Sequence, residues 1–113
     1  MGKSKEITIP EHIQRVLNLI PEGSDSPITV RTLSSLTGFH GTVIRDYISQ
    51  AVVKYGQPIG TSNSVNRSGY YVISTADERE ATIRNLRSRA IKILKRAKAL
   101  EKMPDRGQIK LHL

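Results

Sequence analysis

The first repeated pattern of apolar positions lies near the start of the chain. Its members recur three or four residues apart: Ile13, Val16, Leu17 and Ile20. This spacing predicts a helix within residues 10–23 that buries one face. Pro10 suits the first turn of such a helix, where a missing N–H costs no hydrogen bond, and Pro21 and Gly23 are expected to end it.

A β-branched run and two further helical segments follow. Residues 26–30 predict one short edge strand. Thr29 is placed to cap a helix that runs to about Thr37, and a second helix is expected over residues 42–54. Gly38 falls between these two helices, where a tight turn needs a residue that tolerates positive φ.

The chain then changes to strand-like character before one long helix. Within residues 57–75, two short pieces rich in β-branched residues or tyrosine flank a polar segment, and this pattern predicts a hairpin. A helix is expected over residues 74–103. Thr75 followed three residues later by Glu78 matches a capping box, and Pro104 ends the helix.

The order of these elements predicts an α+β fold of the winged helix-turn-helix type. It has three helices plus a two-stranded wing, followed by a long C-terminal amphipathic helix. The expected divisions are a flexible arm (1–9), the winged helix domain (10–75), a basic amphipathic helix (76–103) and a flexible tail (104–113). A length of 113 residues allows one small domain with such an extension.

The two middle helices meet the steric demands of a helix-turn-helix. Gly38 occupies the turn, and Ser34, four residues earlier, is the small residue needed where the helices touch. Phe39 follows the glycine. Ile44 and Tyr47 lie six and nine residues after Gly38, where apolar side chains fill the wedge between the helices. The alternative interpretation is a generic pair of core-forming helices.

The outward face of the second of these helices is predicted to read DNA. That face comprises His40, Thr42, Val43, Arg45, Ser49 and Gln50. Arg45 can form a bidentate pair with guanine, and Ser49 and Gln50 can bind bases or phosphate. Thr42 lies where backbone N–H groups at a helix start bind phosphate. Asp46 opposes phosphate unless it accepts from cytosine or orients Arg45. A solvated helix face is the alternative.

The predicted hairpin is the wing, with residues 62–69 around its tip. Asn66 and Arg67 are expected to contact DNA there, because Arg67 can reach a phosphate or a minor groove. An ordinary surface turn is the alternative, because Asn, Ser and Gly favour turns in any protein.

The long helix carries a narrow apolar stripe. Its members are Ile83, Leu86, Ala90, Ile93, Ala97 and Leu100. They alternate three and four residues apart, as the a and d positions of a heptad repeat do. A helix of about 27 residues is about 40 Å long, which is more than a small domain covers, so the stripe predicts a homodimer. A helix folded back on its own domain and a helix lying on a membrane surface are the alternatives.

Charge separates the two parts of the chain. The formal net charge is +8, with 7 basic and 5 acidic residues in 1–75 and 11 basic and 5 acidic residues in 76–113. This surplus predicts double-stranded DNA as a partner, because phosphate neutralisation releases counterions. The residues of the long helix expected to contact phosphates are Arg84, Arg87, Arg89, Lys92, Lys95 and Arg96. A solvated basic face is the alternative.

The residue types argue against catalysis, metals and cofactors. The absence of cysteine removes disulfides, thiolate catalysis and cysteine-based zinc sites. His12, His40 and His112 are scattered, without carboxylates at ligand spacing. No apolar run is long enough to span a bilayer, and the first ten residues lack the apolar core of a secretory signal. We therefore expect a cytoplasmic, non-enzymatic protein with no cofactor and no membrane.

Three segments resemble a known family. They are ITVRTLSSLTGFHGTVIRDYISQ, the hairpin from Pro58 to Tyr71, and the segment from Arg87 to Leu94. Over residues 10–102 the chain is similar to small winged helix-turn-helix proteins encoded by phages and prophages of Gram-positive bacteria. The resemblance implies a winged-helix fold, a place in the host bacterial cell and a role in the regulation or replication of phage DNA.

Two functions are compatible with these patterns. The first is a DNA-binding protein of phage type that uses the helix over 42–54 and the wing over 62–69. The second is a winged-helix interaction module that adapts or inhibits a host replication, transcription or defence complex. The weakly basic outward face of helix 42–54 favours the second function, and the basic long helix favours the first.

Overall fold

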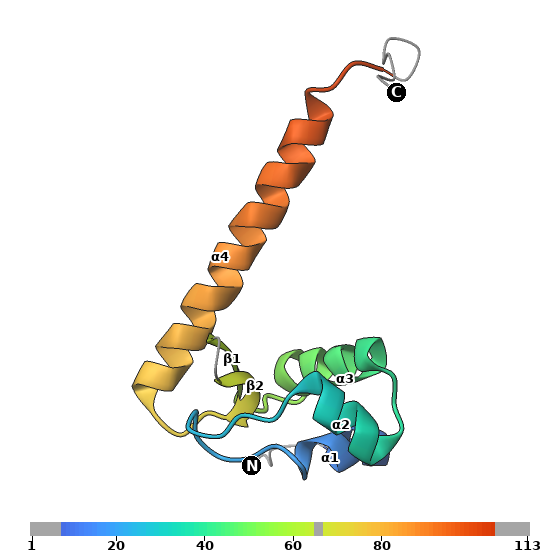
Figure 1. Cartoon of the computed structure of the whole chain (residues 1–113), viewed down its shortest axis with the longest axis vertical. Helices are drawn as coiled ribbons and strands as arrows, with labels where there is room; N and C mark the ends of the chain where they lie inside the picture. Colours follow the sequence, from blue (N-terminus) through green and yellow to red (C-terminus); the bar gives the residue numbers. More distant parts are fainter. Residues whose placement is uncertain (1–7, 65–66, 106–113) are drawn as a thin grey trace, which may run out of the picture. The chain divides into compact units, whose positions relative to one another are not determined.

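The computed structural model describes residues 8–64 and 67–105 (Figure 1). Its elements are α1 (Glu11–Leu17), α2 (Val30–Thr37), α3 (Gly41–Val53), β1 (Ile59–Ser64), β2 (Arg67–Val72) and α4 (Ala76–Glu101). Within the described ranges these make an α+β chain with four helices and one antiparallel pair of strands, and the last helix is the long one that the sequence predicts.

Two compact units divide the chain. Met1–Thr82 is called the N-terminal unit below, and Ile83–Leu113 is called the C-terminal unit. The boundary falls inside α4, so the first two turns of this helix belong to the N-terminal unit. Most of the predicted arm (1–9) and of the predicted tail (104–113) lies outside the described residues.

The core of the N-terminal unit is aliphatic. Its buried cluster is formed by Val16, Ile20, Leu33, Ile44, Ile48 and Ile59. α1, α2 and α3 pack against one another around this cluster, and β1 contributes Ile59 (Figure 1). Burying each of these side chains contributes about 1.5–3 kcal/mol. Ile13 is also fully buried and Leu17 partly so, and the predicted core face of the first helix is therefore confirmed.

The first helix is shorter than predicted. α1 ends at Leu17, and the chain tightens into a turn in which the Leu19 N–H donates to the Val16 carbonyl and the Ile20 N–H donates to the Leu17 carbonyl, both at 3.1 Å. Pro21 explains the early end, because the residue before a proline is disfavoured in the helical conformation. Ile20 is nevertheless buried, because the tighter turn still directs its side chain to the core.

The predicted edge strand over residues 26–30 is reduced to one residue. The Ile28 N–H donates to the Tyr70 carbonyl (2.9 Å), and the Tyr70 N–H donates to the Ile28 carbonyl (2.7 Å). The next hydrogen-bonding positions of this ladder lie two residues away on each strand. The Val72 N–H and carbonyl are already bonded to the Pro21 carbonyl and the Gly23 N–H, and Val30 begins α2. The ladder does not extend, so Ile28 forms an isolated bridge with β2.

β1 and β2 form the predicted antiparallel hairpin. Its register runs from Ile59 opposite Val72 to Ser64 opposite Arg67. Gly69 lies where β2 passes the Ile28 bridge and has a φ of 137°. A Cβ at Gly69 would overlap the carbonyl oxygen of Ile28, so this close approach requires glycine.

α4 begins with a modified capping box. The Thr75 Oγ1 accepts a bond from the Glu78 N–H (3.1 Å), as predicted. The Glu78 carboxylate reaches one residue further back than the motif requires. One of its oxygens accepts from the Ser74 N–H and the other accepts from the Ser24 N–H, both at 2.8 Å. The start of α4 is therefore tied to a loop far away in the sequence.

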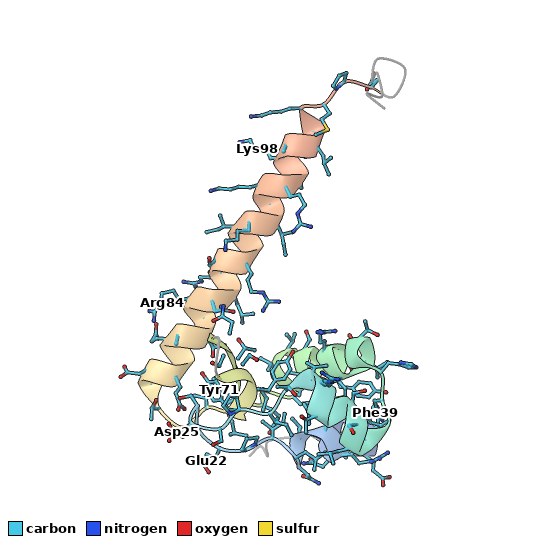
Figure 2. All side chains as sticks on the ribbon, viewed as in Figure 1. Glu22, Asp25, Phe39, Tyr71, Arg84 and Lys98 are labelled. Atoms are coloured by element: carbon cyan, nitrogen blue, oxygen red, sulfur yellow. The ribbon has the colours of Figure 1, made fainter. Side chains whose placement is uncertain are left out.

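Thr82 joins the start of α4 to the hairpin. It is the buried residue of this helix. Its Oγ1 accepts a bond from the Thr61 N–H (3.2 Å) and lies 3.3 Å from the Tyr71 hydroxyl. Figure 2 shows Tyr71 close to the first turns of α4. A polar side chain is accommodated here because its hydroxyl has partners.

Candidate nucleic-acid interface

Short-range hydrogen bonds build the turn between α2 and α3. The Thr29 hydroxyl caps α2 by accepting from the Thr32 N–H (3.0 Å). Gly38 ends the helix with a φ of 82°, as predicted. Its N–H donates to the Ser34 carbonyl (2.8 Å), and the Ser34 hydroxyl donates to the Phe39 carbonyl (2.5 Å). Ser34 therefore fixes the path of the chain between the two helices.

Three aromatic rings and one arginine support this turn. Phe39 meets Tyr47 edge to face with ring centroids 5.4 Å apart, and His12 lies 4.7 Å from Tyr47. The Arg15 guanidinium lies 5.0 Å from the centre of the Phe39 ring and donates to the Thr37 carbonyl (3.2 Å). Figure 2 shows Phe39 at the turn. The sequence pattern did not predict these roles of His12 and Arg15, because their partners lie on α2, on α3 and in the turn between them.

α3 exposes most of its predicted outward face. The opposite side is buried through Ile44, Ile48 and Ala51. The exposed predicted contacts are His40, Thr42, Arg45 and Ser49. Val43 and Gln50 are half-buried. All six predicted contacts thus belong to one helix and its N-cap, and four of them are exposed.

Asp46 is bonded to Gln50. The Gln50 Nε2 donates to the Asp46 Oδ2 (2.8 Å), one helical turn away. One expectation from the sequence, that Asp46 orients Arg45, is therefore replaced by a contact with Gln50. The carboxylate stays on the exposed face, where it repels phosphate, and the Gln50 amide is already engaged.

The start of α3 combines a helix N-terminus without a side-chain cap and a nearby arginine. His40 is the N-cap, and its side chain makes no capping bond, so the N–H groups of the first turn lack a side-chain acceptor from this residue. There is no acidic residue in this turn. The Arg45 Nη1 lies 3.5 Å from the place that a Cβ would take on Gly41. The guanidinium is therefore close to the positive end of the helix dipole, and both favour a phosphate group.

The tip of the hairpin is described in part. Ser64 and Arg67 form the last pair of the ladder. The backbone thus places Arg67 at the end of the hairpin, where the sequence predicts it. Asn66, the other predicted contact of the wing, lies outside the described residues. Asn63 and Ser68, on the two strands beside the tip, are exposed.

The C-terminal unit carries the entire net charge. Residues 1–82 hold 8 basic and 8 acidic residues, and residues 83–113 hold 10 basic and 2 acidic residues, a net of +8. The six predicted phosphate contacts of α4 are all exposed: Arg84, Arg87, Arg89, Lys92, Lys95 and Arg96. Figure 2 shows Arg84 and Lys98 projecting outward from the helix. The boundary between the units separates charge more sharply than the predicted division at residue 75.

The predicted apolar stripe of α4 is largely exposed. Ile83 is half-buried. The remaining members of the stripe, all exposed, are Leu86, Ala90, Ile93, Ala97 and Leu100. The C-terminal unit therefore presents a basic surface and an apolar surface on one helix.

Within the described part of the chain, no three His, Asp or Glu side chains gather as metal ligands. None of the helices described there combines the length and the apolar character needed to cross a membrane.

Comparisons of this chain with protein-family models, with curated proteins and with solved structures found no match. The resemblance to phage winged-helix proteins stays a prediction.

Proposed function

We propose that the chain is a winged helix-turn-helix DNA-binding protein. α3 enters a major groove, the hairpin acts as the wing against the flanking backbone, and α4 adds phosphate contacts. The observation that carries the proposal is the pairing of α2 and α3 through a glycine turn, with Thr42, Arg45 and Ser49 exposed along α3.

In this proposal the exposed residues of α3 make two kinds of contact, with phosphates and with base edges. Thr42 and the first-turn N–H groups suit a phosphate, which would set the register of the helix on the duplex. Arg45 and Ser49 follow one turn apart and reach base edges, where Arg45 pairs best with guanine. Gln50 contributes less, because Asp46 accepts a hydrogen bond from its amide.

The basic surface of α4 supplies affinity without sequence preference. Its lysines and arginines neutralise phosphates and release counterions, so affinity falls as salt rises. The N-terminal unit has no net charge of its own, and the sequence preference of α3 therefore acts on a complex held largely by α4. From the resemblance to phage proteins, we propose that this activity serves the regulation or replication of phage DNA within the host cytoplasm.

A salt titration with matched variants tests the proposal. Binding to a mixed-sequence duplex of about 25 base pairs is measured between about 50 and 300 mM salt, and the slope gives the number of phosphates neutralised. Lys95→Ala is expected to lower that slope by about one at every sequence. Arg45→Ala is expected to relax the preference among duplexes selected from a random pool by about ten-fold.

The control is Arg79→Ala, which removes an exposed arginine paired with Glu80 (3.8 Å) in the first turns of α4. It is expected to leave the sequence preference unchanged. Absence of binding at low salt would overturn the proposal as a whole. An Arg45→Ala variant with the wild-type preference would overturn the role of α3.

A protein-interaction module is the second candidate. The balanced charge of residues 1–82 favours it, as do two apolar side chains with large exposed fractions, Val53 (80%) on α3 and Leu36 (60%) on α2. Such a module would adapt or inhibit a host replication, transcription or defence complex. A host partner retained after nuclease treatment and lost in Val53→Ser would support it. Retention that depends on nucleic acid would favour DNA binding.

A further inference from the structure

The apolar stripe of α4, called the seam below, leaves large side chains in water. Its members are Ile83, Leu86, Ala90, Ile93, Ala97 and Leu100, and Leu94 lies beside it. The exposed fractions are 48% for Leu86, 57% for Ile93, 67% for Leu94 and 59% for Leu100. A continuous apolar strip of this kind marks a surface that a partner covers.

The heptad positions of α4 define which partner fits. With the seam at positions a and d, Arg89 and Arg96 occupy position g, and Arg87, Leu94 and Glu101 occupy position e. Glu101 is the only acidic residue between Ile83 and Pro104. In a parallel pair of helices, each g residue faces the e residue five positions later on the other helix. Arg96 of one copy then faces Glu101 of the other, and the relation occurs twice.

An antiparallel arrangement gives less favourable charge contacts between the same residues. There, position g faces position g and position e faces position e. When the whole seam overlaps, Arg89 of one helix approaches Arg96 of the other, so like charges meet twice. Arg87 faces Leu94, and no opposite charges meet along the seam to offset this. The alanines at 90 and 97 allow two helices of this kind to approach closely. From charge and shape together, we infer that a second copy of this chain covers the seam, with the two α4 helices parallel and in register.

The charge outside the seam makes this assembly sensitive to salt. Residues 84–102 hold eight basic residues and one acidic residue, 8 − 1 = +7 per helix. Two parallel helices of this charge repel each other, and salt screens the repulsion, because the Debye length falls from about 10 Å at 0.1 M to about 3 Å at 1 M. Salt therefore strengthens the dimer while it weakens binding to DNA. The inference does not depend on the proposed function, because the effect of salt on dimerisation is measured with the protein alone, without DNA.

Disulfide trapping tests the orientation in the full chain. The protein has no cysteine, so each variant carries a single thiol. A parallel dimer in register brings the two copies of position 97 together, and Ala97→Cys is expected to form a disulfide dimer upon mild oxidation. Ser88→Cys, on the opposite side of the helix, is the control and is expected to stay monomeric. Trapping of a Leu86→Cys copy to an Ala97→Cys copy, without a disulfide between two Ala97→Cys copies, would overturn the parallel arrangement.

Two variants with the wild-type net charge test the Arg96 to Glu101 pair. Arg96→Glu with Glu101→Arg reverses the pair and retains it, whereas Lys95→Glu with Glu101→Arg moves the acid away from the seam. Sedimentation at about 0.5 M salt is expected to give about ten-fold weaker dimerisation for the second variant than for the first. Equal dimerisation of the two would overturn the pairing.

Sedimentation of the unmodified chain tests whether the dimer forms. The dimer fraction is expected to rise with salt, and Ile93→Asp is expected to abolish it. A monomer at every salt concentration, or binding of the seam to neutral lipid vesicles in place of a second copy, would overturn the inference. Either result would leave the test of DNA binding untouched.

Discussion

The backbone N–H of Ser24 donates a 2.8 Å hydrogen bond to the Glu78 carboxylate, across 54 residues of sequence. Glu78 is the third residue of α4, and its other carboxylate oxygen accepts from the Ser74 N–H (2.8 Å). One side chain thus holds the loop before α2 and the entry into α4 together. Because the N–H groups of Ser74 and then of Ser24 favour the charged form, the pKa of Glu78 is lowered from its ordinary value of 4.5 to about 2.

This pKa predicts how stability depends on pH. A lowered pKa in the folded state means that the unfolded chain binds the proton more readily, so the contribution of Glu78 is complete above about pH 4.5 and is lost towards about pH 2. Glu78→Gln is expected to lower Tm at pH 7, and its difference from wild type is expected to shrink below about pH 4. Thermal unfolding across this range measures both. Glu80→Gln is the exposed control, and a difference that stays constant down to pH 2.5 would contradict the assignment.

The close approach at Gly69 predicts a large effect of a single methyl group. Gly69→Ala places a Cβ against the Ile28 carbonyl oxygen at a φ of 137°, and is expected to destabilise by about 2 kcal/mol or more. Gly56→Ala is the matched control, because Gly56 also has a positive φ (64°) but has no atom within 4 Å of the added Cβ. That variant is expected to cost about 1 kcal/mol. Equal costs in urea unfolding would show that the bridge at Ile28 is not tight.

The attachment of α4 to the hairpin predicts that Thr82 is needed for stability. Thr82→Val keeps the shape of the side chain and removes the hydroxyl that the Thr61 N–H and the Tyr71 hydroxyl contact. The expected loss is about 1–3 kcal/mol, because two polar groups are left without this partner. Ser88→Ala, an exposed hydroxyl removed from the same helix, is expected to change stability by less than about 0.5 kcal/mol. Chemical denaturation of the two variants makes the comparison.

Local chemistry explains why α2 and α3 could be predicted closely from the sequence. The cap at Thr29 and the turn at Gly38 are decided by neighbours within four residues, and such signals are visible in the chain itself. The predicted end of α1 was wrong, because the apolar spacing continues to Ile20, whereas Pro21 ends the helix early, at Leu17. The spacing of apolar residues indicates which side chains are buried, but it does not indicate where the backbone leaves the helical conformation.

Contacts between distant segments could not be predicted in the same way. The capping box at Glu78 is a local pattern, but its bond to Ser24 depends on how the loop is placed. Arg15 reads as a surface charge in α1, whereas the fold brings it to the Thr37 carbonyl and the Phe39 ring. Four of the six residues predicted on this face are exposed and two are half-buried. The spacing did not show that Gln50 donates a hydrogen bond to Asp46.

Asp46 provides the most direct test of whether the proposed DNA interface includes α3. Its carboxylate lies on the exposed face of α3 among the predicted contacts, and a negative charge there opposes phosphate at every duplex sequence. Asp46→Asn keeps an oxygen for the bond from Gln50 and removes the charge. Affinity for a mixed-sequence duplex at about 0.1 M salt is expected to rise by about three- to ten-fold.

The matched control is Glu80→Gln, which removes one negative charge from the first turns of α4 with the same chemistry. If the gain arose only from the change in overall charge, the two variants would tighten binding equally. If α3 lies against the duplex, Asp46→Asn tightens binding more than Glu80→Gln does. The difference in affinity between the two variants then narrows at high salt, because salt screens the repulsion between the Asp46 carboxylate and the phosphates. Anisotropy titrations at two salt concentrations separate these outcomes. If Asp46→Asn left the affinity unchanged while Glu80→Gln changed it measurably, the interface would lie away from α3.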